Sequence, residues 1–238
     1  MARYDVAPAI FRTPKGVPVR VFLRDETNDW NTAYSALNED EYRLAGRDLS
    51  GLALDIGGHI GTVTLALAVD NPTLRVIVLE PIPENLVLLR DNLAANAVAD
   101  RVTVVEGMAG KSGRGQIRYA FKGNETALHH AYIGNSTLAV PEGDHTIIDV
   151  PSYSLGDLIG DQEVTALKID AEGGEYAFLG SSLDSLAQCA LIYGEWHPNA
   201  PEGNNRTQGD ILTLLSPTHE VTFSGPIGGP GGFVAVRR

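Results

Sequence analysis

Short apolar segments alternate along this chain with segments whose apolar residues repeat at helical spacing. Runs typical of buried strands occupy residues 52–57, 75–80, 102–106, 166–170 and 191–196. Helical patterns lie between several of them, for example at 60–69 and from Pro83 onward. Because a parallel strand pair needs a long crossover, usually a helix, the alternation predicts an α/β fold with a mostly parallel sheet.

The end of the chain departs from this alternation. Two further strand-like runs, 221–224 and 233–237, have no helix between them and should pair as an antiparallel hairpin. The expected architecture is therefore a Rossmann-like, mostly parallel seven-stranded sheet with a C-terminal antiparallel hairpin. We expect this domain to span residues 51–238, with 1–50 as an N-terminal lid or substrate segment and an insertion at about 110–160.

Charge and cysteine content limit the classes of partner. The 238 residues contain 18 Lys and Arg against 30 Asp and Glu, a formal net charge of -12, which opposes nucleic-acid binding. The single cysteine, Cys189, fits a reducing compartment, and no apolar run reaches the roughly 18 residues of a membrane helix. We expect a cytoplasmic protein with a small-molecule partner, no nucleic acid and no membrane; a homodimer is one oligomeric alternative.

A glycine-rich turn follows the first predicted strand. A dinucleotide loop of the G-x-G-x-x-G type starting at Gly57 would require glycines where the chain has His59 and Thr62. The observed pattern, Asp55 followed by Gly57 and Gly61, is closer to a loop for S-adenosylmethionine, whose amino-acid tail carries an ammonium that Asp55 could bind. Glycines at such a turn let a ligand approach the backbone closely. The alternative interpretation is a tight turn without a ligand.

Acidic residues close the next two strands. Glu80 lies about 20 residues after the glycine turn, the spacing at which a carboxylate accepts the ribose hydroxyls of a nucleoside. Glu106, Gly107 and Met108 follow the third strand, where an adenine pocket is expected, with Met108 as an apolar wall. Alternatively, Glu80 is a solvated strand end and Met108 belongs to the core.

Five segments of the chain form an ordered series of motifs. They are Thr27-Asn28-Asp29 with Glu41-Tyr42 further on, the glycine loop Leu54–Gly61, Glu80-Pro81-Ile82-Pro83-Glu84-Asn85, Leu167–Glu175 (LKIDAEGGE) and Glu195-Trp196-His197. Together they resemble the FkbM-type methyltransferase family over about Thr27 to His197. The segment LKIDAEGGE is the most distinctive, because it is similar to the family pattern K-[IV]-D-[VI]-E-G-x-E.

This resemblance implies a class I methyltransferase that uses S-adenosylmethionine, commonly to methylate hydroxyls of sugars, polyketides or other secondary metabolites. It also implies that Thr27, Asn28, Gly58 and Pro81 contact the methyl donor together with the residues named above. One departure is His59, which stands where the family usually has Asn. Gly58 in place of Ala is a minor change.

Charged residues crowd the end of the fourth strand, namely Lys168, Asp170, Glu172 and Glu175. Ligands of open α/β sheets lie beyond the carboxyl ends of the strands, so Asp170 and Glu172 should face the methyl acceptor. A hydroxyl must lose its proton on methylation, which makes a carboxylate base plausible, with Lys168 as a further catalytic candidate. Alternatively, Glu175 caps the following helix and Lys168 only neutralises the acids.

Glu195 and His197 end the neighbouring strand, and alternation places both side chains on one face of it. With Asp170 they could form a base with its orienting partner, or a metal site with two oxygen ligands and one nitrogen ligand. We favour the base, and His197 could also form an ordinary hydrogen bond in the core. The histidines of the insertion are expected to be solvated or to face the substrate: His129, His130 and His145.

The motifs together predict an S-adenosylmethionine-dependent O-methyltransferase for a small molecule. One competing hypothesis is an N-methyltransferase acting on a small-molecule amine. Another is a non-catalytic protein that binds adenosylmethionine. An NAD-dependent oxidoreductase is a third, which the spacing of the glycines disfavours.

Overall fold

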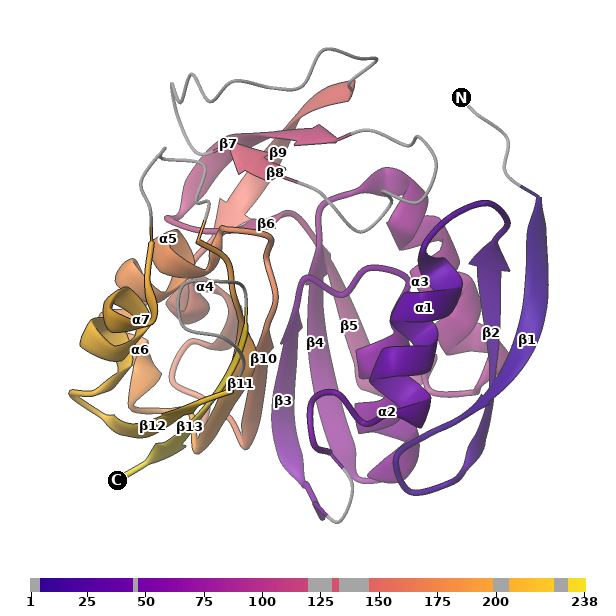
Figure 1. Cartoon of the computed structure of the whole chain (residues 1–238), viewed down its shortest axis with the longest axis horizontal. Coiled ribbons are helices and arrows are strands. Elements are labelled where there is room, and N and C mark those ends of the chain that lie inside the picture. Colours follow the sequence, from indigo (N-terminus) through magenta and orange to yellow (C-terminus); the bar gives the residue numbers. More distant parts are fainter. Residues whose placement is uncertain (1–4, 45–46, 120–129, 133–145, 199–205, 225–230) are drawn as a thin grey trace.

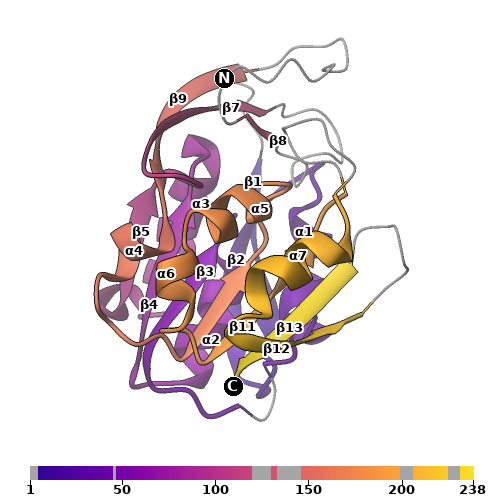
Figure 2. The ribbon, with the colours of Figure 1, turned by 90° about the vertical axis from the view of Figure 1, so that its left-hand side faces the viewer.

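A twisted seven-stranded sheet forms the centre of the molecule in the computed structural model (Figure 1). The structure describes residues 5–44, 47–119, 130–132, 146–198, 206–224 and 231–238, with the backbone alone for 130–132. Helices cover both faces of the sheet, and a smaller sheet lies beyond its upper edge in Figures 1 and 2.

The order of the strands in the central sheet is that of a doubly wound fold. Across the sheet they are β12 (His219–Phe223), β13 (Gly231–Arg237), β11 (Leu191–Trp196), β10 (Ala166–Ile169), β3 (Gly51–Ile56), β4 (Leu74–Glu80) and β5 (Val102–Glu106). Strands β11, β10, β3, β4 and β5 run parallel, whereas β13 is antiparallel to both β11 and β12. The predicted sheet with its C-terminal antiparallel hairpin is therefore confirmed.

Strand alternation divides the core between the two faces of the sheet. Within β3, Ala53 packs on one face, whereas Leu52 and Leu54 pack on the other. The first face carries α2 (Thr62–Asp70) and α3 (Pro83–Ala95), which a 3-10 turn (Ala99–Arg101) follows. The second face carries α4 (Leu155–Ile159), α5 (Glu175–Gly180), α6 (Leu183–Leu186) and α7 (Gln208–Leu215), seen in front of the sheet in Figure 2. Among the described residues, no helix is long and apolar enough to cross a membrane.

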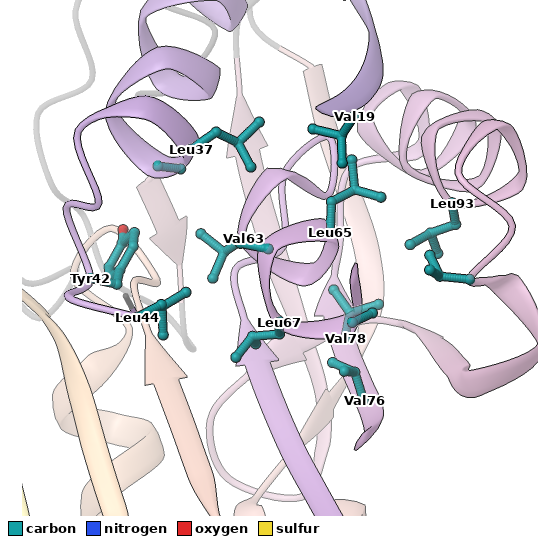
Figure 3. Packing of buried hydrophobic residues seen from close by; sticks show 14 of the residues in the cluster. Val19, Leu37, Tyr42, Leu44, Val63, Leu65, Leu67, Val76, Val78 and Leu93 are labelled. Atoms are coloured by element: carbon teal, nitrogen blue, oxygen red, sulfur yellow. The ribbon is translucent and has the colours of Figure 1, made fainter. Parts of the chain in front are cut away.

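The N-terminal segment packs against helices on the first face. It contains β1 (Val6–Arg12), β2 (Pro18–Arg24), α1 (Asp29–Ala33) and a π-helical turn (Tyr34–Asn38). The two strands form an antiparallel hairpin, and Val19, Val21 and Leu23 alternate along β2 into the core shared with α2 and α3. Figure 3 shows Val19 beside Leu65 of α2. Asn92 of α3, and Asn96 directly after it, each accept a hydrogen bond from a backbone N–H of β2, at 2.6 and 2.9 Å.

The insertion forms a second sheet of its own. Its strands are β6 (Met108–Ala109), β9 (Thr146–Tyr153), β7 (Gly113–Tyr119) and β8 (His130–Tyr132), in this spatial order. Figure 1 shows this sheet above the carboxyl ends of β3 and β4. Met108, Ile117 and Val150 pack on Ile82, so the insertion is joined to the start of α3 by a small apolar cluster.

Candidate active site

A cavity of about 700 Å³, including its open mouth, lies at the carboxyl ends of β3, β4 and β10. Its apolar wall includes Leu79, Ile82, Met108 and Ile117. Glu80 and Asp170 bring two carboxylates to the same space. A mostly apolar cavity with few polar groups, at the carboxyl ends of parallel strands, is where an α/β sheet binds a small ligand.

The glycine loop is shaped by close backbone contacts. The N–H groups of Gly57 and Gly58 both donate to the carbonyl oxygen of Leu79, at 2.9 and 3.0 Å. Gly57 has a φ of +80°, and a Cβ there would lie 1.8 Å from the backbone oxygen of Asp170. A Cβ at Gly58 would lie 2.2 Å from Cγ2 of Val78, so a larger residue here would clash with the Val78 side chain. The loop therefore packs directly on the residue that follows β10.

Asp55 and Lys168 form a buried ion pair behind this loop. Lys168 Nζ lies 3.2 Å from Asp55 Oδ1 and donates to the carbonyl of Gly57 at 2.7 Å. Thr64 donates to the other oxygen of Asp55 at 2.6 Å. Burial alone would lower the pKa of Lys168, but the carboxylates of Asp55 and Asp170 raise it above its ordinary value. The pair holds the loop in place, and neither side chain is part of the cavity wall.

Glu80 ends β4 with both carboxylate oxygens bound and one side facing the cavity. Its Oε2 accepts from the backbone N–H of His59 at 2.8 Å, and its Oε1 accepts from Ile82 N–H and Asn85 Nδ2 at 3.0 Å each. Burial raises the pKa of Glu80 to about 7, against the effect of these hydrogen bonds. A carboxylate has about four acceptor positions, so Oε2 can still accept a hydrogen bond from a ribose hydroxyl.

A buried network connects Glu80 to the N-terminal segment. Arg24 forms a two-point ion pair with Asp29, at 2.8 Å for each contact, and also donates to Asn85 at 2.9 Å. Asn85 in turn donates to Glu80, and His59 lies 3.6 Å from Asp29. Burial lowers the pKa of His59 to about 4, so its imidazole is neutral near pH 7. Sequence reasoning did not single out Arg24 as a site residue, because no local pattern marks an arginine as buried.

Two non-glycine residues of the cavity wall have a left-handed backbone. They are His59, with a φ of 50°, and Glu172, with a φ of 49°. This conformation costs about 1–2 kcal/mol for a residue with a side chain, and it persists where the surrounding contacts fix the backbone. His59 follows the glycine loop and Glu172 follows β10, so the strained positions lie on the two elements that face each other across the cavity.

Glu175 and His197 form a second buried pair, beyond the ends of β10 and β11. Glu175 begins α5 and is fully buried. Its Oε1 accepts from the N–H groups of Ala171 and Gly173 at 2.9 and 3.2 Å, and lies 3.0 Å from His197 Nδ1. Tyr176 donates to the carbonyl of His197 at 2.9 Å. Glu175 thus orders the loop before the helix and also orients the imidazole.

Further carboxylates surround this imidazole. His197 Nε2 lies 3.5 Å from Glu172 and 3.8 Å from Glu195, so both ring nitrogens face carboxylates. Burial, together with the charge of Asp170, raises the pKa values of Glu172 and Glu195 to about 8. Burial opposes a charge on His197, but Glu175 and Glu172 raise its pKa to about 10. In this arrangement His197 is protonated and donates to Glu175, its Nε2 lies within ion-pair distance of Glu172 and Glu195, and Asp170 is the better placed proton acceptor.

The structure separates the predicted site residues into those in the cavity wall and those around it. Predicted residues in the wall are Gly57, His59, Glu80, Pro81, Gly107, Met108, Asp170 and Glu172. Predicted residues outside it are Asp55, Gly58, Gly61, Lys168, Glu195 and His197. His129 and His145 lie outside the described residues, and only the backbone of His130 is described.

Three predicted donor contacts lie away from the cavity wall. Glu106 is exposed at the end of β5 and forms an ion pair with Arg90. Thr27 and Asn28 make hydrogen bonds within their own turn. From the same N-terminal segment, Thr32 lines the cavity instead. The family resemblance implies that this segment contacts the donor, but it does not tell which of its residues faces the cavity.

Solved structures that are similar in fold include two candidate methyltransferases. A candidate O-methyltransferase from Nostoc punctiforme has a TM-score of 0.52 at 12% identity, with 88% of this chain and 58% of that chain covered. A candidate rRNA methylase from Clostridium thermocellum has a TM-score of 0.51 at 11% identity, with 84% and 94% covered. At these identities the likeness shows the fold alone. None of the curated proteins compared with this chain matches it in sequence.

The fold and the glycine loop together define a class I methyltransferase architecture. Residues 55–224 match the model of the methyltransferase FkbM domain, and the chain belongs to this family. The resemblance found in the motifs is therefore confirmed. Membership makes the protein a methyltransferase with S-adenosylmethionine as its methyl donor.

Proposed function

We propose that the protein transfers a methyl group from S-adenosylmethionine to a hydroxyl of a small molecule, such as a sugar, a polyketide or another secondary metabolite. This proposal rests on the position and the contacts of Asp170. It lines the cavity, Tyr42 donates to its Oδ2 at 3.1 Å, and its buried Oδ1 has no hydrogen-bond partner among the described residues. A fixed carboxylate with one unused oxygen, beside the donor loop, can accept a proton from an acceptor hydroxyl.

The residues on the donor side of the cavity fit an adenosyl nucleoside. Gly57 leaves the space that a Cβ would fill, and Glu80 offers a carboxylate to a diol at the end of β4. Met108 and Ile117 provide an apolar surface of the kind that covers an adenine ring. His59 is neutral and presents its backbone N–H to Glu80, so it adds no positive charge against a sulfonium.

The chain contributes alignment and proton removal to the reaction. When bound, the donor supplies a methyl group whose carbon–sulfur bond breaks, with its electron pair left on sulfur, as a carbon–oxygen bond to the acceptor forms. Asp170 receives the proton of the hydroxyl. Tyr42 and Lys168 hold Asp170 in place, the ammonium of Lys168 lying 3.9 Å from its Oδ2. Positioning of this kind and a placed base are the usual contributions of a protein to such a transfer.

A small acceptor fits the charge of the protein better than a nucleic acid. The chain has a net charge of -12, and the acceptor side of the cavity carries Asp170 and Glu172. Phosphate backbones are repelled by such a surface.

The experiment is a screen of small hydroxyl and amine compounds, with mass spectrometry detecting the gain of one methyl group. On the best acceptor, Asp170→Asn should lower kcat by about 10²- to 10⁴-fold with little change in donor affinity. Asp184→Asn, an exposed carboxylate on α6, serves as the matched control and should leave kcat unchanged. Methylation of amines alone would establish the N-methyl alternative. Donor binding without any methylated product would favour a non-catalytic protein.

A further inference from the structure

We infer that Asp170, Glu175 and His197 form a binding site for one divalent metal ion on the acceptor side of the cavity. A mixed set of carboxylates and an imidazole suits ions such as Mn²⁺ or Zn²⁺. The sequence suggested Asp170, Glu195 and His197 as a lesser alternative. The structure replaces Glu195 by Glu175 in the set and leaves Glu195 beside it, 3.8 Å from the imidazole.

The first support is geometric. One oxygen or nitrogen atom from each of these three residues lies within 4.8 Å of the other two. With metal–ligand bonds of about 2.0–2.2 Å and bond angles of about 90–120°, the ligand atoms of one ion stand roughly 2.8–3.8 Å apart. Shifts of up to about 1 Å in these side chains would therefore bring them to one ion.

The second support is that two carboxylates each have one buried oxygen without a hydrogen-bond partner among the described residues. Glu175 is fully buried, and its Oε1 is bound by the loop before α5, but its Oε2 has no hydrogen-bond partner among the described residues. Asp170 has the same arrangement, with Oδ2 bound by Tyr42 and Oδ1 unused. A buried acceptor without a partner is costly, and a cation at this point would satisfy both oxygens.

The third support is the balance of charge. Four carboxylates, those of Asp170, Glu172, Glu175 and Glu195, converge on the single imidazole of His197, where Glu175 and Glu172 lie 3.0 and 3.5 Å from its two nitrogens. The ammonium of Lys168 is paired with Asp55 and lies 3.9 Å from Asp170, so it offsets only part of this charge. A divalent ion would neutralise the carboxylates without their taking up protons, and on binding it would displace a proton from the imidazole.

The role of the ion rests on the proposed function, whereas its binding does not. An ion at Asp170 would lie where the acceptor oxygen must approach the donor. It would hold that oxygen and lower the pKa of the hydroxyl. With the ion bound, Asp170 would serve as its ligand, and the proton that Asp170 receives in the ion-free reaction would pass instead to a neighbouring carboxylate. The residues Glu172 and Glu195 then border the ion without being needed as ligands.

The test measures ion binding by the full chain without donor or acceptor. Calorimetric titration with Mn²⁺, and separately with Zn²⁺, should show one ion bound per chain with micromolar or tighter affinity. Glu175→Gln and Asp170→Asn keep the side-chain shape and should weaken binding by about tenfold or more. Asp184→Asn, the exposed control, should bind as the wild type does. The rise in Tm on adding the ion provides a second measurement, which also reports whether each variant is folded.

Two results would overturn the inference: no saturable binding up to millimolar ion, or equal binding by the wild type and both folded variants. These failures are distinct from failure of the proposed function. If a chelator leaves methylation of a hydroxyl acceptor intact and no ion binds, the metal site is wrong and the O-methyltransferase remains. If an ion binds at these residues and no hydroxyl acceptor is methylated, the metal site stands and the proposed reaction is wrong.

Discussion

Substitution of Gly57 tests quantitatively the contact between the donor loop and Asp170, the residue that follows β10. In Gly57→Ala the new Cβ would lie 1.8 Å from the oxygen and 2.9 Å from the carbon of the Asp170 carbonyl, at a φ of +80°. Gly16→Ala is the matched control, because Gly16 has a φ of +84° and no heavy atom within 4 Å of the same point. Both variants strain the backbone, and only one also creates a clash.

The difference between the two variants isolates the clash. Backbone strain costs each of them about 1–2 kcal/mol. Overpacking against a fixed backbone costs Gly57→Ala about 1–3 kcal/mol more. For a chain of this length, 1 kcal/mol corresponds to about 2–4 °C in Tm, so Gly57→Ala should melt roughly 2–12 °C below Gly16→Ala.

Thermal unfolding and calorimetric titration with S-adenosylhomocysteine provide the two measurements. The clash must move either the loop or the residue that follows β10, so Gly57→Ala should also bind this ligand at least about tenfold more weakly, a loss of about 1.4 kcal/mol. Gly16→Ala should bind it as the wild type does. Equal melting temperatures and equal affinities for the two variants would refute the argument that Gly57 is required by its contact with Asp170.

Further predictions concern the donor side of the cavity. Glu80 has its pKa raised to about 7 by burial, with the ammonium of Lys168 favouring its ionised form, so it is mostly protonated below that pH and ionised above it. Donor affinity should therefore rise several-fold between about pH 6 and pH 8, because ionised carboxylates accept stronger hydrogen bonds, and Glu80→Gln should bind the donor more weakly and lose this dependence. An unaltered pH profile in the variant would show that another group titrates. Asn85→Ala removes the bonds to Arg24 and Glu80 and should cost about 1–3 kcal/mol, measured by chemical unfolding. A stability unchanged within error would mean that water replaces Asn85.

The elements that could be predicted from the sequence are those with a local signal. The apolar runs at 52–57 and 75–80 coincide with β3 and β4 to within a residue at each end. Short runs of β-branched and aliphatic residues favour a buried strand over other secondary structures. Gly57 and Glu80 were located by the same route, because a glycine turn and a strand-end acid follow directly from those strands. The final hairpin was predictable from the missing helix between its strands.

The rest depends on contacts between distant parts of the chain. In the sequence, Arg24 and Asp29 are indistinguishable from ordinary surface charges. Their burial near Asn85 follows only from the fold. Glu175 has a carboxylate that a local rule assigns to helix capping, whereas its contact with His197 spans two strands. Strands β1 and β2 begin with apolar residues mixed with prolines, a composition that weakens any prediction of a strand.

The hairpin of β1 and β2 has a consequence for what counts as a unit of folding in this protein. The segment that identifies the family begins at residue 55, but Val19, Val21 and Leu23 complete the core on which α2 and α3 rest. A truncated protein that begins at residue 55 would expose the apolar face of these helices to solvent. It would also remove the hydrogen-bond partners in β2 of the Asn92 and Asn96 side chains. The part that matches the family model is therefore smaller than the part that can fold as a stable unit.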